Sequence, residues 1–348
     1  MNSFELESYL AKGTEGLVKD ILRATAREPQ ESAFILRFSA DSLKAQRKRE
    51  KLNRKGHHVP PLLICSLTDE CCSGCFAGNR TADGGTQLSA NEWLSVFGQA
   101  AGCGISFIVL SGGEPLLRRD VIYSAARQED VLFPVFTKGS ILDDEYTELF
   151  DKHRNLFPVL SIDNEKVSRE SLFEKMAAMQ QRGVLFGASV TVTKENTDEV
   201  CSSEFVSELR SRGCRAVVYT EYVPADGRED IAPDEISRVQ MALRIDELKK
   251  TFGNMVFISF PGDERASGDC LGAGRGFFHI NAFGGAEPCP FSPYSDCNIR
   301  SGSLMDMLDS RLFRELNRQG VLTGWHDGGC VLYERRELVE KILEEQKR

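Results

Sequence analysis

The sequence has no long apolar run. None approaches the roughly 20 residues that a membrane-spanning helix requires, so we expect no membrane partner. The first residues, Met1 to Glu5, also lack the basic segment followed by an apolar one that marks a secretory signal. We therefore expect a cytoplasmic protein.

Basic residues are fewer than acidic ones. The 348 residues include 43 Lys and Arg against 52 Asp and Glu, and the net charge of -9 argues against a general nucleic-acid binder. One basic stretch, residues 44–55, departs from this balance. It is interpreted either as the solvated face of a helix or as a docking surface for an acidic partner. With 41% hydrophobic and 27% charged residues, the chain is expected to form a packed core.

Cysteine, by contrast, is present in number. In a reducing cytosol the 11 cysteines are not expected to form disulfides. Four stand alone in strand or helix patterns and are expected to be buried thiols: Cys65, Cys103, Cys201 and Cys214. Seven cluster near Gly and Pro at expected loop positions: Cys71, Cys72, Cys75, Cys270, Cys289, Cys297 and Cys330. Clustered cysteines in an intracellular chain indicate metal ligands.

Strand and helix patterns alternate through the middle of the chain. Apolar strands are expected at residues 62–67, 105–110, 131–136, 156–162, 184–192 and 216–223, with a further strand at 255–260. Helices are expected near residues 89–101, 118–128, 143–152, 170–182, 199–212 and 233–252, and later near 303–318 and 333–346. The alternation predicts right-handed crossovers and a parallel sheet. Six units fit an open, partial (β/α)6 TIM-like barrel of the α/β class.

Three domains are predicted. Residues 1–58 have leucines at helical spacing and form a helical N-terminal extension, in which Pro29 ends one helix and Phe34 begins another. Residues 59–260 form the barrel. Residues 261–348 form a small Cys-rich domain. A domain that buries so little core is commonly stabilised by metal.

Polar residues and glycines follow the expected strands. The carboxyl ends of parallel strands meet at one edge of the sheet, where ligands bind. The residues expected there are Cys71, Cys72, Cys75, Gly112, Gly113, Glu114, Pro115, Ser161, Asp163 and Thr191. Iron–sulfur clusters are held by Cys thiolates, and a cubane held by three would leave one iron free for a ligand. The two glycines would let the backbone approach that ligand closely.

These motifs resemble those of radical SAM enzymes with a C-terminal auxiliary-cluster domain of the SPASM or twitch kind. Residues 66–77 resemble the family's cluster loop, and residues 111–115 resemble its motif for the methionine part of S-adenosylmethionine. Residues 161–163 and 221–224 resemble its later strand ends. The resemblance covers residues 60–335.

The resemblance implies a radical SAM oxidoreductase of the maturase type. A [4Fe-4S] cluster on Cys71, Cys72 and Cys75 would pass one electron to S-adenosylmethionine, and a 5′-deoxyadenosyl radical would then abstract a hydrogen atom from a substrate. The cofactor-binding residues would be Gly112, Gly113, Glu114, Pro115, Ser161, Asp163 and Thr191. The implied partners are a peptide or protein substrate and a reductant such as ferredoxin or flavodoxin.

The C-terminal cysteines resemble an auxiliary cluster site. Cys270 and Cys289 have the spacing that opens the family's auxiliary domain, and Cys297 and Cys330 would complete four thiolates. A [4Fe-4S] cluster is the expected occupant. A zinc ion on the same four thiolates is the alternative.

The first cysteine loop departs from the family's spacing. The family has three residues between its first two cysteines and two between the second and third, whereas Cys71 and Cys72 are adjacent here. Because Cys72 and Cys75 match the last two ligands, we assign the contraction to the residues before Cys72. Lys138 also stands where Asn is usual. The alternative hypothesis is therefore a non-catalytic metal-cluster binding protein on the same scaffold, with a degenerate first site.

Overall fold

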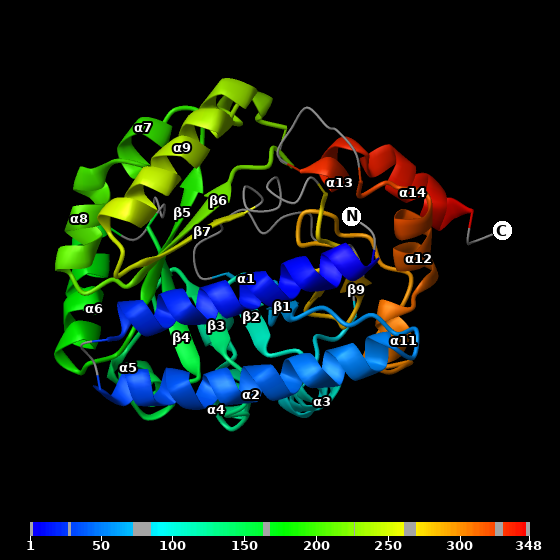
Figure 1. Cartoon of the computed structure of the whole chain (residues 1–348), viewed down its shortest axis with the longest axis horizontal. Coiled ribbons are helices and arrows are strands. Elements are labelled where there is room, and N and C mark those ends of the chain that lie inside the picture. The colour runs from blue at the N-terminus through cyan, green and yellow to red at the C-terminus, as the bar shows by residue number, and fades with distance from the viewer. Residues whose placement is uncertain are drawn as a thin grey trace.

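The computed structural model describes residues 3–26, 29–71, 85–162, 168–225, 227–260, 269–323 and 330–345 (Figure 1). Three predicted site residues, Cys72, Cys75 and Asp163, lie outside these ranges. In the described part of the chain no helix has the length and apolar character needed to cross a membrane. The predicted cytoplasmic location stays a prediction.

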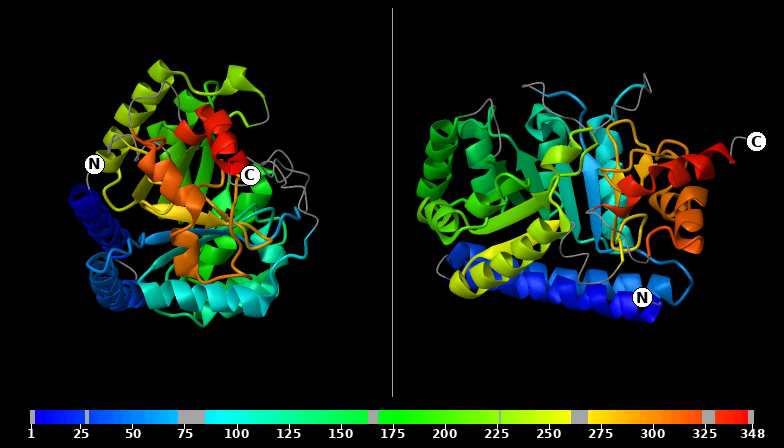
Figure 2. Two further views of the ribbon diagram at one scale, coloured as in Figure 1. Left: turned by 90° about the vertical axis from the view of Figure 1, so that its right-hand side faces the viewer. Right: turned by 90° about the horizontal axis from the view of Figure 1, so that it is seen from above.

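A curled parallel sheet forms the centre of the molecule (Figures 1 and 2). Its first strands follow chain order: β1 (Leu62–Ser66), β2 (Phe107–Ser111), β3 (Phe133–Thr137), β4 (Leu156–Ser161), β5 (Gly187–Val192), β6 (Ala216–Glu221) and β7 (Val256–Phe260). Each strand pairs in parallel with the next. The predicted partial barrel is confirmed, and the further strand predicted at 255–260 joins it as β7.

Helices connect these strands on the outer face of the sheet. They are α3 (Ala90–Cys103), α4 (Arg119–Ala126), α5 (Asp144–Lys152), α6 (Arg169–Gln181), α7 (Thr197–Val200), α8 (Ser203–Ser211) and α9 (Glu235–Thr251), with the 3-10 turns η1 (Pro115–Leu117) and η2 (Glu229–Ile231). Ser89 begins α3 in a capping box with Glu92, and Gly104 ends it at a φ of 95°. The single helix predicted at 199–212 is wrong, because Ser202 accepts a hydrogen bond from Phe205 N and starts α8 separately from α7.

The main core lies between the sheet and these outer helices. Leu63 and Cys65 on β1 have no exposed surface, whereas Leu62 and Ile64 point to the concave side and are half-buried. The sheet therefore has a filled outer face and a more open inner face.

Three of the four lone cysteines are buried in this core, as predicted: Cys65, Cys201 and Cys214. Cys103 is half-buried and packs against the same core. Burial raises the pKa of the Cys201 and Cys214 thiols to about 12. These two thiols are therefore protonated packing groups at neutral pH.

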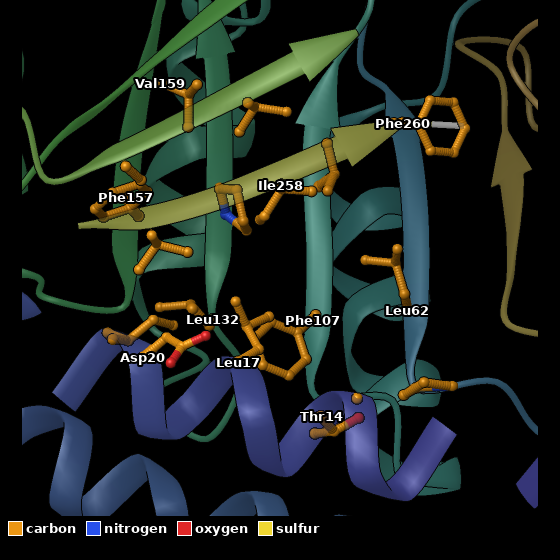
Figure 3. Close-up of a pocket in the computed structure, with 18 of the residues that line it drawn as sticks. Thr14, Leu17, Asp20, Leu62, Phe107, Leu132, Phe157, Val159, Ile258 and Phe260 are labelled. Carbon is orange, nitrogen blue, oxygen red and sulfur yellow. The ribbon is translucent and has the colours of Figure 1, made fainter. Parts of the chain in front are cut away.

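The N-terminal extension forms two long helices, α1 (Ser3–Ala24) and α2 (Pro29–Asn53), as the predicted helical extension requires. They lie across the amino ends of the strands, where Val18 and Phe38 pack with Phe107 and Leu132 (Figures 1 and 3). The prediction that the second helix begins at Phe34 is wrong. It begins at Pro29, because proline is well suited to the first position of a helix.

Two basic side chains of α2 hold the C-terminal end of α3. Lys48 Nζ donates to Ala101 O at 3.0 Å, and Arg49 Nη1 donates to Gly104 O. Arg49 is 4% exposed, and burial lowers its pKa to about 10. Neither interpretation of the basic stretch accounts for these two residues, which satisfy the last carbonyls of a neighbouring helix.

The C-terminal part joins the same sheet at its other edge. β8 (Phe277–Ile280) pairs in parallel with β1, and β9 (Ala286–Glu287) pairs antiparallel with β8. Within the described residues the sheet order is therefore β7-β6-β5-β4-β3-β2-β1-β8-β9. The helices that follow are α11 (Leu304–Leu308), α12 (Arg311–Arg318), α13 (Val331–Glu334) and α14 (Arg336–Glu344), so each of the two predicted helices is divided. The division into three domains stays a prediction.

Candidate functional site

The predicted mouth residues follow the carboxyl ends of neighbouring parallel strands. Ser66, the last residue of β1, pairs with Ser111, the last residue of β2. Ser161 ends β4 beside Ser189 of β5, and Thr191 lies two residues further along β5. The topology therefore brings the described members of the predicted cofactor site to one edge of the sheet.

The glycines after β2 pack against the segment that leads to Cys71. A Cβ at Gly112 would lie 2.4 Å from Thr68 O, and one at Gly113 would lie 1.9 Å from Glu70 O. Gly112 also has a φ of 121°, which side chains other than hydrogen rarely allow. The sequence predicts that the backbone of these glycines approaches a ligand closely. In the structure it approaches the backbone of Thr68 and Glu70.

Glu114 is fully buried and joins this turn to the end of β3. Its Oε1 accepts hydrogen bonds from Leu116 N at 3.1 Å and Thr137 Oγ1 at 2.8 Å. Its Oε2 accepts from Lys138 N at 3.0 Å. Pro115 follows as the first residue of η1. The carboxylate therefore fixes two loops of the mouth, and its role in binding the methionine part of S-adenosylmethionine stays a prediction.

Lys138 is a site residue that sequence reasoning noticed only as a departure from the family. Its Nζ lies 3.1 Å from Cys71 Sγ, while its backbone is held by Glu114. Cys71 is disulfide-bonded in this structure, against the expectation that the cysteines form no disulfides, so the Lys138 ammonium faces a disulfide sulfur. The signal available in the sequence was a cation directly after a strand end.

The described C-terminal cysteines approach one another around Gly272. A Cβ at Gly272 would lie 3.4 Å from Cys270 Sγ, 3.0 Å from Pro288 O and 3.4 Å from Leu332 Cδ1. Pro288 precedes Cys289, and Leu332 follows Cys330 by two residues. The neighbourhoods of these three cysteines therefore converge.

Cys297 lies beside β9, where its carbonyl accepts from Ala286 N at 3.2 Å. Burial raises the pKa of its thiol to about 12. Among the described residues, no group of three or more His, Cys, Asp or Glu side chains is arranged to hold a metal ion. Four thiols in one region are compatible with an iron–sulfur cluster or a zinc ion. They are not arranged around a common centre in this structure, so the four-thiolate site stays a prediction.

A cavity of about 760 Å³ occupies the concave side of the sheet, between the strands and α1. Figure 3 shows Leu17 and Asp20 of α1 beside Phe107 and Leu132, with Val159 further along the sheet. The lining is mainly apolar and extends to Ser111 at the mouth. The interior of the barrel can therefore take a large apolar group beneath the predicted cofactor site.

No family model matches the sequence. The chain is 24% identical over 307 residues to the AdoMet-dependent heme synthase of Methanosarcina barkeri, a match that covers 77% of this chain and 87% of that one. It is 24% identical over 252 residues to the PqqA peptide cyclase of Gluconobacter oxydans, covering 66% and 70%.

Two solved structures share the fold. SuiB of Streptococcus suis, bound to the precursor peptide SuiA, has a TM-score of 0.63 at 16% identity and covers 79% of this chain and 71% of its own. The anSMEcpe structure with bound AdoMet and the Cp18Cys peptide has a TM-score of 0.55 at 15% identity, covering 73% and 81%.

These relatives confirm the predicted family, the predicted enzyme class and the predicted use of S-adenosylmethionine with a [4Fe-4S] cluster. They do not favour the non-catalytic alternative. The predicted ligand residues are not tested by them. In sequence and in fold the chain is similar to radical SAM enzymes.

Proposed function

We propose that the chain is a radical SAM oxidoreductase that modifies a peptide or protein. Cys71, Cys72 and Cys75 would hold the [4Fe-4S] cluster. When bound, the cluster would supply one electron for the reductive cleavage of S-adenosylmethionine to methionine and a 5′-deoxyadenosyl radical, which removes a hydrogen atom from the substrate. The observation that carries this proposal is the junction built on Glu114, which ties the glycine turn to Lys138 beside Cys71.

The chain's own groups position and shield this chemistry. Gly113 N donates to Thr68 O at 2.7 Å and Glu114 N donates to Glu70 O at 2.9 Å, so the approach to Cys71 is fixed by the turn after β2. Lys138 places a positive charge at the same sulfur. The apolar lining beneath offers water few hydrogen-bond partners in the interior. A one-electron donor such as ferredoxin or flavodoxin would supply the electron.

A peptide substrate is supported by three relatives. PqqA peptide cyclase is named for a reaction on a peptide, SuiB is bound to its precursor peptide, and anSMEcpe has a bound peptide. We extend this substrate class to the present chain. A peptide side chain would enter the concave cavity from the mouth, since Ser111 lines the cavity directly before the glycine turn.

A porphyrin is the second candidate substrate. The cavity of about 760 Å³ is lined by aromatic residues that include Phe107, Phe136 and Phe260, which suits a large flat apolar molecule. Two relatives are named AdoMet-dependent heme synthase and Fe-coproporphyrin III synthase. Titration with Fe-coproporphyrin III, followed by its absorbance, separates the candidates, because only a porphyrin enzyme is expected to bind it tightly.

Anaerobic reconstitution with iron and sulfide, followed by dithionite and S-adenosylmethionine, tests the activity. We expect 5′-deoxyadenosine in the wild-type protein and none above background in Cys71→Ala. Cys103→Ala is the matched control, because this half-buried cysteine packs away from the mouth against the main core. Absence of 5′-deoxyadenosine from the wild type would refute the proposal. About eight iron atoms per chain are expected for two cubanes, and about four for one.

A further inference from the structure

A chain of three polar side chains crosses the edge between β1 and β8. Ser66 Oγ lies 2.8 Å from His279 Nε2, and His279 Nδ1 lies 2.7 Å from Glu287 Oε2. His279 and Glu287 are 4% and 3% exposed, while Ser66 is half-buried. Hydroxyl, imidazole and carboxylate are thus connected in the order that general-base catalysis uses to activate a hydroxyl.

The β8–β9 hairpin holds Glu287, the last of these three side chains, in place. Asn281 Nδ2 donates to the second oxygen of Glu287, Oε1, at 2.6 Å. The Asn281 side-chain oxygen in turn accepts from Phe283 N and Gly285 N, at 3.0 and 2.9 Å. The turn of the hairpin therefore orients the carboxylate, and the carboxylate orients the imidazole.

One tautomer of His279 satisfies both contacts. With the hydrogen on Nδ1, His279 donates to Glu287, and Nε2 is the acceptor for the Ser66 hydroxyl. Ser66 Oγ is left with lone pairs only, and its remaining partner must be a hydrogen donor.

Ser66, the open end of this series of side chains, follows cavity-lining residues of β1. Leu62 and Ile64 line the cavity, and Ser66 is the next residue on that face of β1. Phe277 also lines the cavity, and His279 is the next residue on that face of β8. Ser111, the register partner of Ser66, lines the cavity at its mouth.

We propose that Ser66, His279 and Glu287 form a proton relay that accepts a proton from a substrate held in the barrel. This inference rests on the proposed function, for which it names the proton acceptor and the substrate chemistry, an N–H or O–H group. The substrate proton passes to Ser66 Oγ as the Ser66 proton passes to His279 Nε2. No electron moves in this step, the substrate group becomes its conjugate base, and Glu287 stabilises the resulting imidazolium.

Reaction of the reconstituted protein with diisopropyl fluorophosphate tests the relay. Ser66 Oγ would bond to phosphorus, fluoride would leave, and the Ser66 proton would pass to His279. We expect mass spectrometry to locate the label on Ser66, at a rate at least about 100-fold above Ser111, since a general base contributes about 10² or more. Ser111 is the internal control because it ends the adjacent strand in register with Ser66 and lines the cavity.

His279→Gln and Glu287→Gln keep the side-chain volume close to that of the wild type and are expected to reduce the labelling rate to that of Ser111. Equal labelling of Ser66 and Ser111 in the wild type would overturn the relay, and so would unchanged labelling of Ser66 in folded His279→Gln. Glu287→Gln provides the same comparison if His279→Gln does not fold. Labelling needs neither S-adenosylmethionine nor reductant, so its failure is distinct from a failure to form 5′-deoxyadenosine.

Discussion

At the scale of single residues, the glycine turn after β2 packs against the protein's own backbone. The backbone of Gly112 and Gly113 lies directly against Thr68 and Glu70, with no room for a Cβ. The position of two glycines after an apolar strand was visible in the sequence. The contact was not, because it joins segments that are far apart along the chain.

Replacing Gly113 with Ala is expected to destabilise the fold. The new Cβ would lie 1.9 Å from Glu70 O, so backbone must move, at a cost of about 1–3 kcal/mol in the free energy of unfolding. Urea unfolding measures the change. Gly98→Ala is the control, because no heavy atom lies within 4 Å of its Cβ position in α3, and it is expected to raise stability by about 0.5–1 kcal/mol. Equal stability of the two variants would contradict the packing described here.

The candidate site shows the same limit of sequence reasoning. Gly112, Gly113 and Glu114 could be predicted from a motif that follows a strand. The second role of Glu114, which holds Lys138 N, requires β3 to lie beside β2, and side-chain register cannot be read from one sequence. The contact of Ser66 with His279 was missed because Ser66 was interpreted only as part of the cluster loop, and the two residues lie on strands that pair only in the folded chain.

At the scale of elements, strands with long apolar runs were predicted and short ones were not. β8 and β9 were missed because they are two- to four-residue strands within a segment rich in Gly, Pro and Cys. The helix predicted at 303–318 is divided because Ser310 accepts a hydrogen bond from Phe313 N and caps α12. A capping serine inside a helical pattern is a signal that periodicity alone does not detect.

The glycines of α1 provide a test of the cavity beneath the sheet. Gly13 and Gly16 both line it, and no heavy atom lies within 4 Å of either Cβ position. Each alanine is therefore expected to raise the free energy of unfolding by about 0.5–1 kcal/mol, since glycine is unfavourable inside a helix. Thermal unfolding of Gly13→Ala and Gly16→Ala measures this. A loss of stability in both would show that α1 packs more tightly on the strands than described.

An ion pair joins α3 to the C-terminal region and predicts a pH dependence. Arg300 Nε donates to Glu92 Oε1 at 2.6 Å, and Arg300, followed by Ser89, lowers the pKa of Glu92 to about 2. A carboxyl with a lowered pKa in the fold contributes stability above the unfolded value, near 4.5, and loses it as the pH falls toward 2.

Glu92→Gln is therefore expected to be less stable than the wild type at pH 7, with a difference that shrinks between pH 5 and pH 2. Urea unfolding at several pH values measures the difference. Glu247→Gln, on an exposed position of α9, is the control and is expected to have little effect at any pH. A difference that is constant with pH would exclude the Arg300 contact as its origin.

At the scale of the whole molecule, the barrel and the C-terminal region share a sheet and a core. β8 extends the sheet beyond β1 through four registered residue pairs. Phe278 of β8 is fully buried and contacts Phe313 of α12 edge to face, with ring centroids 6.2 Å apart. Both belong to the same hydrophobic cluster as Leu63 of β1. The domain boundary predicted near residue 261 therefore crosses a continuous core.

A continuous core predicts one cooperative unfolding transition. We expect differential scanning calorimetry to give a single peak, with calorimetric and van't Hoff enthalpies that agree, and fluorescence of buried Trp93 to follow it. Phe278→Ala in the C-terminal region and Phe186→Ala in the barrel remove fully buried rings and should each cost about 3–5 kcal/mol. Both should lower the same transition temperature, because strands that pair along β1 and β8 cannot separate without exposing the core. Two peaks, with each variant shifting only its own, would contradict this and support the predicted domain boundary.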